Sequence, residues 1–146
     1  MISIRPQFVE AILSGDKTVE LRRRAFNLHP GDRLWIYTTF PKAAVQASAI
    51  IEDVLVAEPM ILWEKVESSC RLTKSEFDSY FVGAVSACAI RFRDVFQVAP
   101  EISLNALRQE ACGFHPPQNL MWIPERHPLW TLFQSILETS TIPALA

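Results

Sequence analysis

Short runs in which apolar and polar residues alternate predict most of the strands. The runs 2–5, 34–39 and 44–57 are rich in β-branched and aromatic residues, as strands are. A longer run of the same kind covers 84–99, and "NLMWI" after two prolines predicts a short closing strand. In "SGDKTVELRRR" (14–24), two apolar residues alternate with charged ones, which predicts another strand.

Between these runs, apolar residues recur at helical spacing, which predicts helices there. Pro6 is suited to the first turn of a helix, and Gly15 to the left-handed residue that ends one. Thr73 and Glu76 have the spacing of a capping box, and Ser103 is placed to cap another helix. The predicted helices cover 6–13, 58–66, 73–81, 104–111 and 128–140.

The last predicted helix is too apolar on one face to stand in water. Its apolar residues recur at helical spacing, from Leu129 to Leu137. We therefore expect it to cover an apolar surface, either of its own domain or of a second subunit. A homodimer is one arrangement that the sequence leaves open.

The order of these elements is β-α-β-β-β-α-α-β-α-β-α. Too few helices connect the strands for a doubly wound parallel sheet. We expect an α+β fold, mostly β, with a small mixed barrel of five to six strands decorated by helices and 14–24 as an internal strand. We predict a domain over 1–125, followed by a helical extension and a loose tail over 126–146.

Composition narrows the class of protein. The chain has 146 residues and is 49% hydrophobic, which fits one domain that folds without metals or disulfides. Its three cysteines form no C-x-x-C pair, and its histidines form no ligand pattern, so we expect no metal and no cofactor. We see neither a basic-then-apolar leader nor an apolar run of about 18 residues, and we expect a cytoplasmic protein without membrane contact.

Positive charge is concentrated in the first third of the chain. The net charge is −2, but residues 1–50 carry a balance of +3 and residues 51–146 a balance of −5. Because local potential decides whether a cleft attracts an anion, an anionic ligand near 14–24 is favoured.

The basic stretch also carries a family resemblance. "ILSGDKTVELR", followed by "PGDRLWIY", resembles the ASCH domain, a branch of the PUA-like superfamily whose characteristic motif is G-x-K-x-x-E-x-R. The motif residues are Gly15, Lys17, Glu20 and Arg22. The resemblance continues through "SIRP", "LTKSEFDSYFVG", "ISLNALR" and "PPQN", over 1–123.

The resemblance implies a barrel of five or six strands with a cleft lined by the motif. It also implies action on RNA or on modified nucleobases. Some family members hydrolyse the acetyl amide of acetylcytidine, others are described as nucleases, and many are described as regulators.

The residue types of the motif suit an anionic ligand. In a regular strand, Glu20 and Arg22 share one face and Val19 takes the other, whereas Lys17 reaches the cleft only if the chain bends just after Gly15. A desolvated lysine can bind phosphate or act as a base or nucleophile, and the arginine fork fits phosphate. The alternative is an ion-paired cluster that only holds the corner between helix and strand.

Further candidates flank the motif. Arg5 ends the first strand, Thr18 shares the parity of Glu20, and the third strand ends in the polar and aromatic residues Tyr37 and Thr38, followed by Thr39 and Phe40. Such residues can stack on bases or recognise their edges, or can simply pack in the sheet. Arg23 and Arg24 are either a solvated strand end or a track for phosphates.

The sequence therefore predicts a protein that binds RNA or a modified nucleobase or nucleoside through the Lys17–Glu20–Arg22 cleft. The alternative is a hydrolase, with Lys17 and Glu20 as catalytic residues, acting on acetylcytidine or on RNA. The acetylcytidine-hydrolysing relatives carry a threonine in place of Glu20. They also carry a glutamate near the position of Cys70, where the nearest acids of this chain are Glu64 and Glu67.

Overall fold

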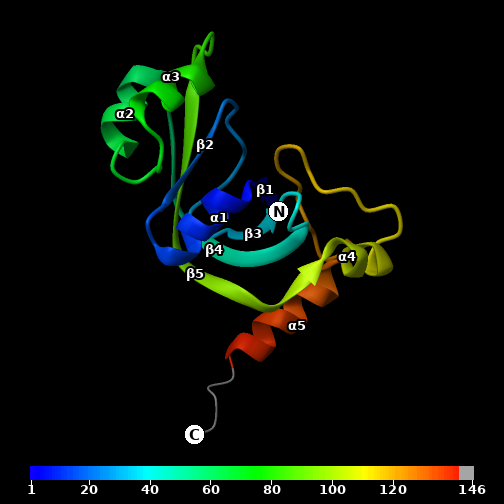
Figure 1. Cartoon of the computed structure of the whole chain (residues 1–146). Coiled ribbons are helices and arrows are strands. Elements are labelled where there is room, and N and C mark those ends of the chain that lie inside the picture. Colours follow the sequence, from blue (N-terminus) through cyan, green and yellow to red (C-terminus); the bar gives the residue numbers. More distant parts are fainter. Residues whose placement is uncertain (142–146) are drawn as a thin grey trace, which may run out of the picture.

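The computed structural model describes residues 1–141, and the predicted tail from 142 onwards lies outside that range (Figure 1). Five strands and five helices make up the described chain. In order they are β1 (Ile2–Ile4), α1 (Pro6–Ser14), β2 (Val19–Arg22), β3 (Arg33–Thr38), β4 (Ala44–Ala57), α2 (Pro59–Val66), α3 (Lys74–Phe81), β5 (Ala87–Ser103), α4 (Leu104–Glu110) and α5 (Trp130–Thr141).

The strands form one mixed sheet in the order β1-β3-β4-β5-β2. Only β1 and β3 are parallel, and the other three pairings are antiparallel. The expected α+β class, mostly β and mostly antiparallel, is confirmed. The sheet differs from the expected barrel in one respect: within residues 1–141 no ladder joins β1 to β2, so it does not close.

Two sequence-based predictions about the strands were wrong. The basic stretch forms an edge strand, β2, and not an internal one. Residues 119–123 form no strand, because Leu120 makes only a single bridge to Ile2 and prolines flank the segment. A proline cannot donate to a ladder, which prevents this segment from extending its pairing.

The edge position of β2 explains part of its charge. An exposed edge with unpaired backbone groups invites pairing with another chain, and charged side chains discourage it. The guanidinium of Arg23 donates to the backbone oxygens of Tyr80 and Val82, which ties the end of β2 to the end of α3.

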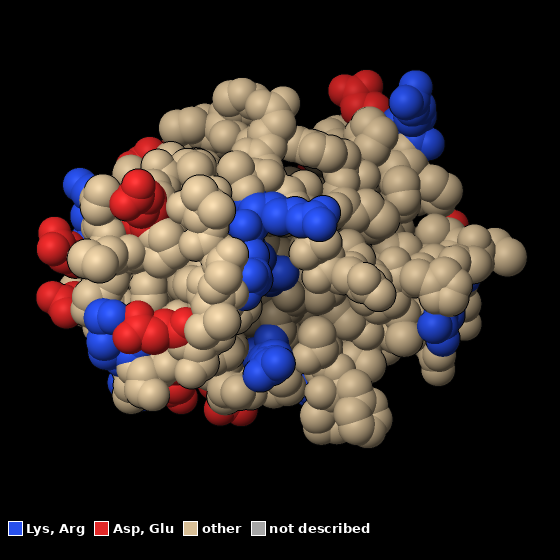
Figure 2. Space-filling view, turned by 90° about the horizontal axis from the view of Figure 1, so that it is seen from above, with Lys and Arg blue, Asp and Glu red and all other residues tan. Residues whose placement is uncertain are grey.

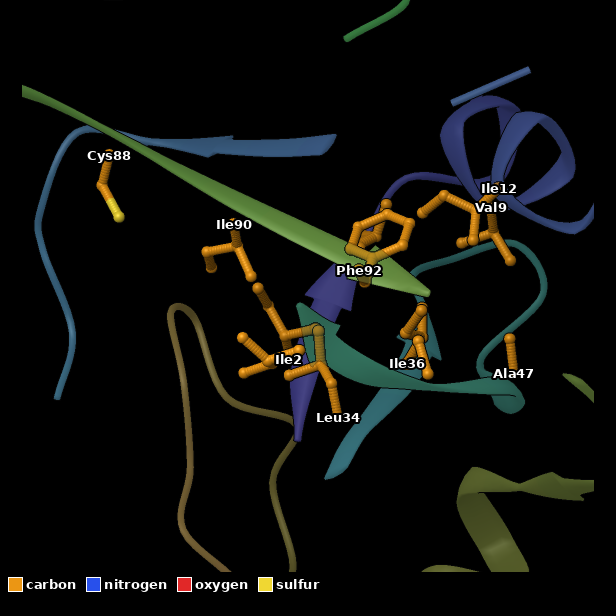
Figure 3. Close-up of a cluster of buried hydrophobic side chains, with 12 residues drawn as sticks. Ile2, Val9, Ile12, Leu34, Ile36, Ala47, Cys88, Ile90 and Phe92 are labelled. Carbon is orange, nitrogen blue, oxygen red and sulfur yellow. The ribbon is translucent and has the colours of Figure 1, made fainter. Parts of the chain in front are cut away.

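The central core lies between α1 and the sheet. Figure 3 shows Val9 and Ile12 pointing from α1 towards side chains of the sheet that include Ile36 and Phe92. Gly15 ends α1 with φ of 86°, the left-handed conformation that the sequence predicts. This turn brings the chain directly from the packed helix into the charged segment.

Two further clusters of buried residues lie at the two ends of the sheet (Figure 1). At one end, α2 and α3 pack against β2 and the start of β5. At the other, α5 packs on the sheet, where Phe133 stacks on Trp35 with ring centroids 4.4 Å apart. The last helix therefore covers an apolar surface of its own domain. No helix within residues 1–141 is long and apolar enough to cross a membrane.

We predict that Phe133→Ala lowers the free energy of unfolding by about 3 kcal/mol or more, because Phe133 is 1% exposed and its removal leaves a cavity against Trp35. Urea unfolding followed by tryptophan fluorescence measures the change. The control is Glu138→Ala on the exposed side of α5, which should change stability by less than about 0.5 kcal/mol. Equal effects of the two substitutions would show that α5 does not stabilise the sheet.

Candidate functional site

One large cleft, of about 920 Å³, opens where the start of α1, the edge strands β1 and β2, and helix α3 meet. The loop at 116–118 completes its wall. Seen from above, Lys and Arg side chains gather around a hollow near the middle of the visible face (Figure 2). The basic residues that line the cleft are Arg5, Lys17 and Arg22.

Lys17 lies at the floor of this cleft, and the end of α1 places it there. Its backbone amide donates to Ala11 across the Gly15 turn, and the next amide, of Thr18, donates to the oxygen of Ser69. The bend that the motif requires is therefore present. The Lys17 side chain is only 3% exposed, and its amine donates to the backbone oxygen of Cys70 at 2.7 Å.

Glu20 connects the two motif cations. One carboxylate oxygen lies 3.5 Å from the Lys17 amine, and the other lies 2.9 Å from Nη2 of Arg22. The same Nη2 donates to the backbone oxygen of Ser3 at 2.7 Å. The Arg22 side chain thus bridges the two open edges of the sheet, from β2 to β1.

Burial of this cluster changes the pKa of Lys17 and leaves few groups to pair with its charges. Desolvation holds the pKa of Lys17 below its usual value, while the Glu20 carboxylate raises it and partly offsets that effect. An ammonium has three protons to donate, and the Cys70 and Glu20 contacts use two of them. Nε of Arg22 is buried and has no hydrogen-bond partner among the described residues. Lys17 keeps one N–H beyond these contacts, and Arg22 keeps the N–H groups of Nη1 besides that of Nε. Both cations line the cleft and therefore have donors left for a ligand oxygen.

The structure brings together most of the predicted site residues at the cleft, and two of them lie outside its lining. Arg5, Lys17, Glu20, Arg22 and Tyr37 all line the cleft, as do Thr39 and Phe40.

The two predicted residues that do not line it are threonines. Thr18 is exposed and precedes β2, so strand parity does not apply to its side chain. Thr38 is buried, and its hydroxyl bonds to the side chain of Gln46 in the neighbouring strand.

Sequence reasoning missed the far wall of the cleft. Helix α3 contributes Ser75, Glu76, Ser79 and Tyr80, and the 116–118 loop contributes Gln118. The capping box at Thr73 predicted where α3 begins, and the structure confirms it. No local pattern indicates that α3 packs opposite α1, because that placement depends on contacts between distant parts of the sequence.

The acids considered for the acetylcytidine reaction lie elsewhere. Glu64 and Glu67 are exposed, the first on α2 and the second directly after it, and neither lines the cleft. Cys70 supplies only its backbone oxygen to Lys17. Across residues 1–141, no group of three or more His, Cys, Asp or Glu side chains is placed to hold a metal ion.

Comparison with known proteins gives consistent matches. The ASCH domain family model matches residues 2–96. A protein described as an "ASCH domain-containing ribonuclease", from Zymomonas mobilis subsp. mobilis, is 36% identical over 123 residues, which cover 84% of this chain and 82% of that protein.

Solved structures agree with the sequence matches. The crystal structure of ASCH from Zymomonas mobilis superposes with a TM-score of 0.83 at 32% identity and covers 90% of this chain and 92% of that one. A tyrosine-to-phenylalanine mutant of the Zymomonas mobilis protein matches with a TM-score of 0.84 at 32% identity, over 91% of this chain and 94% of that one.

We predict that Glu20→Gln lowers the free energy of unfolding by about 3 kcal/mol at neutral pH, because it leaves Lys17 and Arg22 buried without a carboxylate. Urea unfolding measures this loss. The matched control is Glu52→Gln, which makes the same chemical change at an exposed position of β4. A loss no larger than that of the control would show that the cluster is solvated rather than buried.

The same variant has a predicted pH dependence. The pKa of Lys17 is lower in the folded protein than the ordinary 10.5, so the folded state binds fewer protons and stability rises with pH between the two values. Removing the Glu20 carboxylate lowers the pKa of Lys17 in the folded protein further. The pH range over which stability rises therefore becomes wider. The deficit of Glu20→Gln relative to wild type should therefore shrink between pH 7 and about pH 9.5. A deficit that is constant or grows would contradict this.

Proposed function

The chain belongs to the ASCH domain family, and from that premise and the geometry of the cleft we propose that it binds RNA there and hydrolyses the phosphodiester backbone. The observation that carries the proposal is the buried Lys17–Glu20–Arg22 cluster at the floor of a large open cleft. A buried ion cluster is poor evidence for stability, whereas perturbed ionisable groups in a cleft are typical of functional sites. The ribonuclease name of a relative that matches most of the chain supports the same activity.

We assign a different role in RNA binding and cleavage to each charged residue of the cleft, according to its chemistry. Arg22, through the N–H groups that its contacts leave free, and Arg5 bind phosphate oxygens. In the cleavage step the 2′-hydroxyl oxygen of the RNA bonds to the adjacent phosphorus as its proton passes to water, and the bond from phosphorus to the 5′-oxygen breaks. Lys17 neutralises the charge that develops and donates a proton to that leaving oxygen, which a lowered pKa makes easier. Glu20 keeps Lys17 protonated and oriented before the reaction.

The wall opposite α1 suits nucleobases. Tyr80 offers an aromatic surface, and Gln118 with the α3 serines offers donors and acceptors for base edges. Tyr37 of β3 also lines the cleft but is only 3% exposed. A cytoplasmic location and a homodimer stay predictions.

Binding without turnover is the second candidate, because the cluster can hold a phosphate whether or not it is cleaved. Cleavage and binding without turnover both require RNA to bind in this cleft. Only cleavage produces shorter RNA fragments, so their appearance distinguishes the two functions. Release of cytidine from acetylcytidine, with RNA left intact, would support the amidohydrolase alternative instead.

We predict that Lys17→Ala abolishes cleavage of a labelled RNA and weakens its binding about tenfold, since one buried cation is lost from the phosphate site. Lys17→Arg should keep part of the binding and lose cleavage, because an arginine keeps its charge but does not give up its proton. Gel analysis of the products and fluorescence anisotropy measure the two effects.

The matched control is Lys65→Ala, which removes the same charge from an exposed position of α2 outside the cleft. The melting temperature of each variant separates loss of function from loss of fold. Full cleavage by folded Lys17→Ala would rule out a role for Lys17 in the reaction.

RNA affinity should also depend on salt. Each phosphate that a cation neutralises contributes roughly −0.7 to the slope of log K against log salt for single strands. With three cations lining the cleft we expect a slope of about −2, measured by anisotropy at several salt concentrations. An affinity that does not change with salt would point to a neutral ligand.

A further inference from the structure

A second hollow adjoins the cleft on the outer side of the turn that follows β3. Its volume is about 530 Å³, and it shares Arg5, Gln7, Thr39 and Phe40 with the cleft. Its remaining lining residues are Pro6, Glu10 and Pro41. The two hollows therefore adjoin, with Arg5 and Phe40 at the boundary between them.

Phe40 is the residue at this boundary that a structural role does not explain. It is 86% exposed, which is unusual for a large aromatic side chain of a folded domain. The turn that carries it is held by its backbone, since the Thr39 amide donates to Ile4 of β1 and the Thr39 oxygen accepts from the amide of Lys42. An exposed ring on a turn whose backbone is held in place is a suitable platform on which a nucleobase can stack.

Arg5 supplies the charge that belongs beside such a platform. It is exposed, it precedes α1, and no hydrogen bond or ion pair to its side chain is found among the described residues. The one acid in the second hollow is Glu10, three residues beyond Gln7 on α1. A phosphate is therefore favoured on the Arg5 side of the hollow, and the base on the side of Phe40 and Pro41.

We propose that this second hollow binds the nucleotide next to the one held in the cleft, with its base stacked on Phe40 and the linking phosphate on Arg5. This inference rests on the proposed RNA function and extends it, because it requires a substrate of at least two nucleotides whose strand passes over Phe40. Stacking accepts every base, so the site adds affinity with little sequence preference.

The test compares two probes on the full chain. The first is a fluorescent, 2′-O-methylated oligoadenylate of six nucleotides, which cannot be cleaved by attack of its own 2′-hydroxyl, and the second is AMP as a competitor. Phe40→Ala should weaken binding of the hexamer about tenfold and that of AMP by a clearly smaller factor, because a single nucleotide meets Phe40 only at the edge of the cleft whereas the hexamer also stacks a base on it. The control is Trp122→Ala, which removes an exposed aromatic residue that lines neither hollow.

A second pair of variants tests the phosphate. Arg5→Ala and Arg24→Ala each remove one exposed arginine, but only Arg5 lines the hollows. Arg5→Ala should reduce the salt slope of hexamer binding by about 0.7, and Arg24→Ala should leave it unchanged.

The outcomes separate this inference from the proposed function. If Phe40→Ala binds the hexamer as tightly as Trp122→Ala does, or if it weakens AMP as much as the hexamer, the second site is overturned and the cleft function stands. If the wild-type protein binds neither the hexamer nor AMP, both are overturned.

Discussion

The buried ion cluster of Lys17, Glu20 and Arg22 is the interaction on which the rest of the structure around the cleft depends. Glu20 compensates two cations that the fold has removed from water, and each cation makes one further bond to a distant backbone oxygen. Lys17 reaches Cys70 in the segment between α2 and α3, and Arg22 reaches Ser3 in β1. Three segments that are far apart in the sequence thus meet at one charged point.

That arrangement explains why the sheet can stay open. β1 and β2 share no ladder, and the side chain of Arg22 links them where a closed barrel would have backbone pairing. A side-chain link leaves room for a cleft with polar walls, whereas continued pairing would fill it. The charge of this stretch therefore has two separable roles: Arg23 and Arg24, exposed just beyond β2, discourage pairing at the edge, and the ion cluster forms the floor of the cleft.

Much of the fold and the centre of the site could be predicted from the sequence because their signals are local. Pro6 and Gly15 delimit α1, the capping box begins α3, and alternation around Val19 identifies β2. Strand parity also predicted that Glu20 and Arg22 share a face, and the ion pair between them agrees with that prediction.

The features that differ from the sequence-based expectations depend on tertiary packing. Thr18 has the parity of Glu20 but lies outside the strand, and Thr38 turns to Gln46 rather than to the cleft. The edge position of β2 and the contribution of α3 to the cleft are set by packing between distant segments, which no local pattern carries. The sequence offers Phe40 as one of four residues that can stack on bases or pack in the sheet, and only the structure shows that its side chain is exposed.

The central claim is that the buried cluster contacts the RNA backbone rather than merely holding a corner of the fold. A crystal structure of the protein with an uncleavable 2′-O-methyl adenosine dinucleotide tests this claim most directly. We expect a phosphate oxygen within hydrogen-bond distance of the Lys17 amine or of the Arg22 guanidinium, with the Lys17–Glu20 pair still in place. A phosphate bound away from both groups, with the cluster unchanged, would contradict the claim and leave the cluster a structural role only.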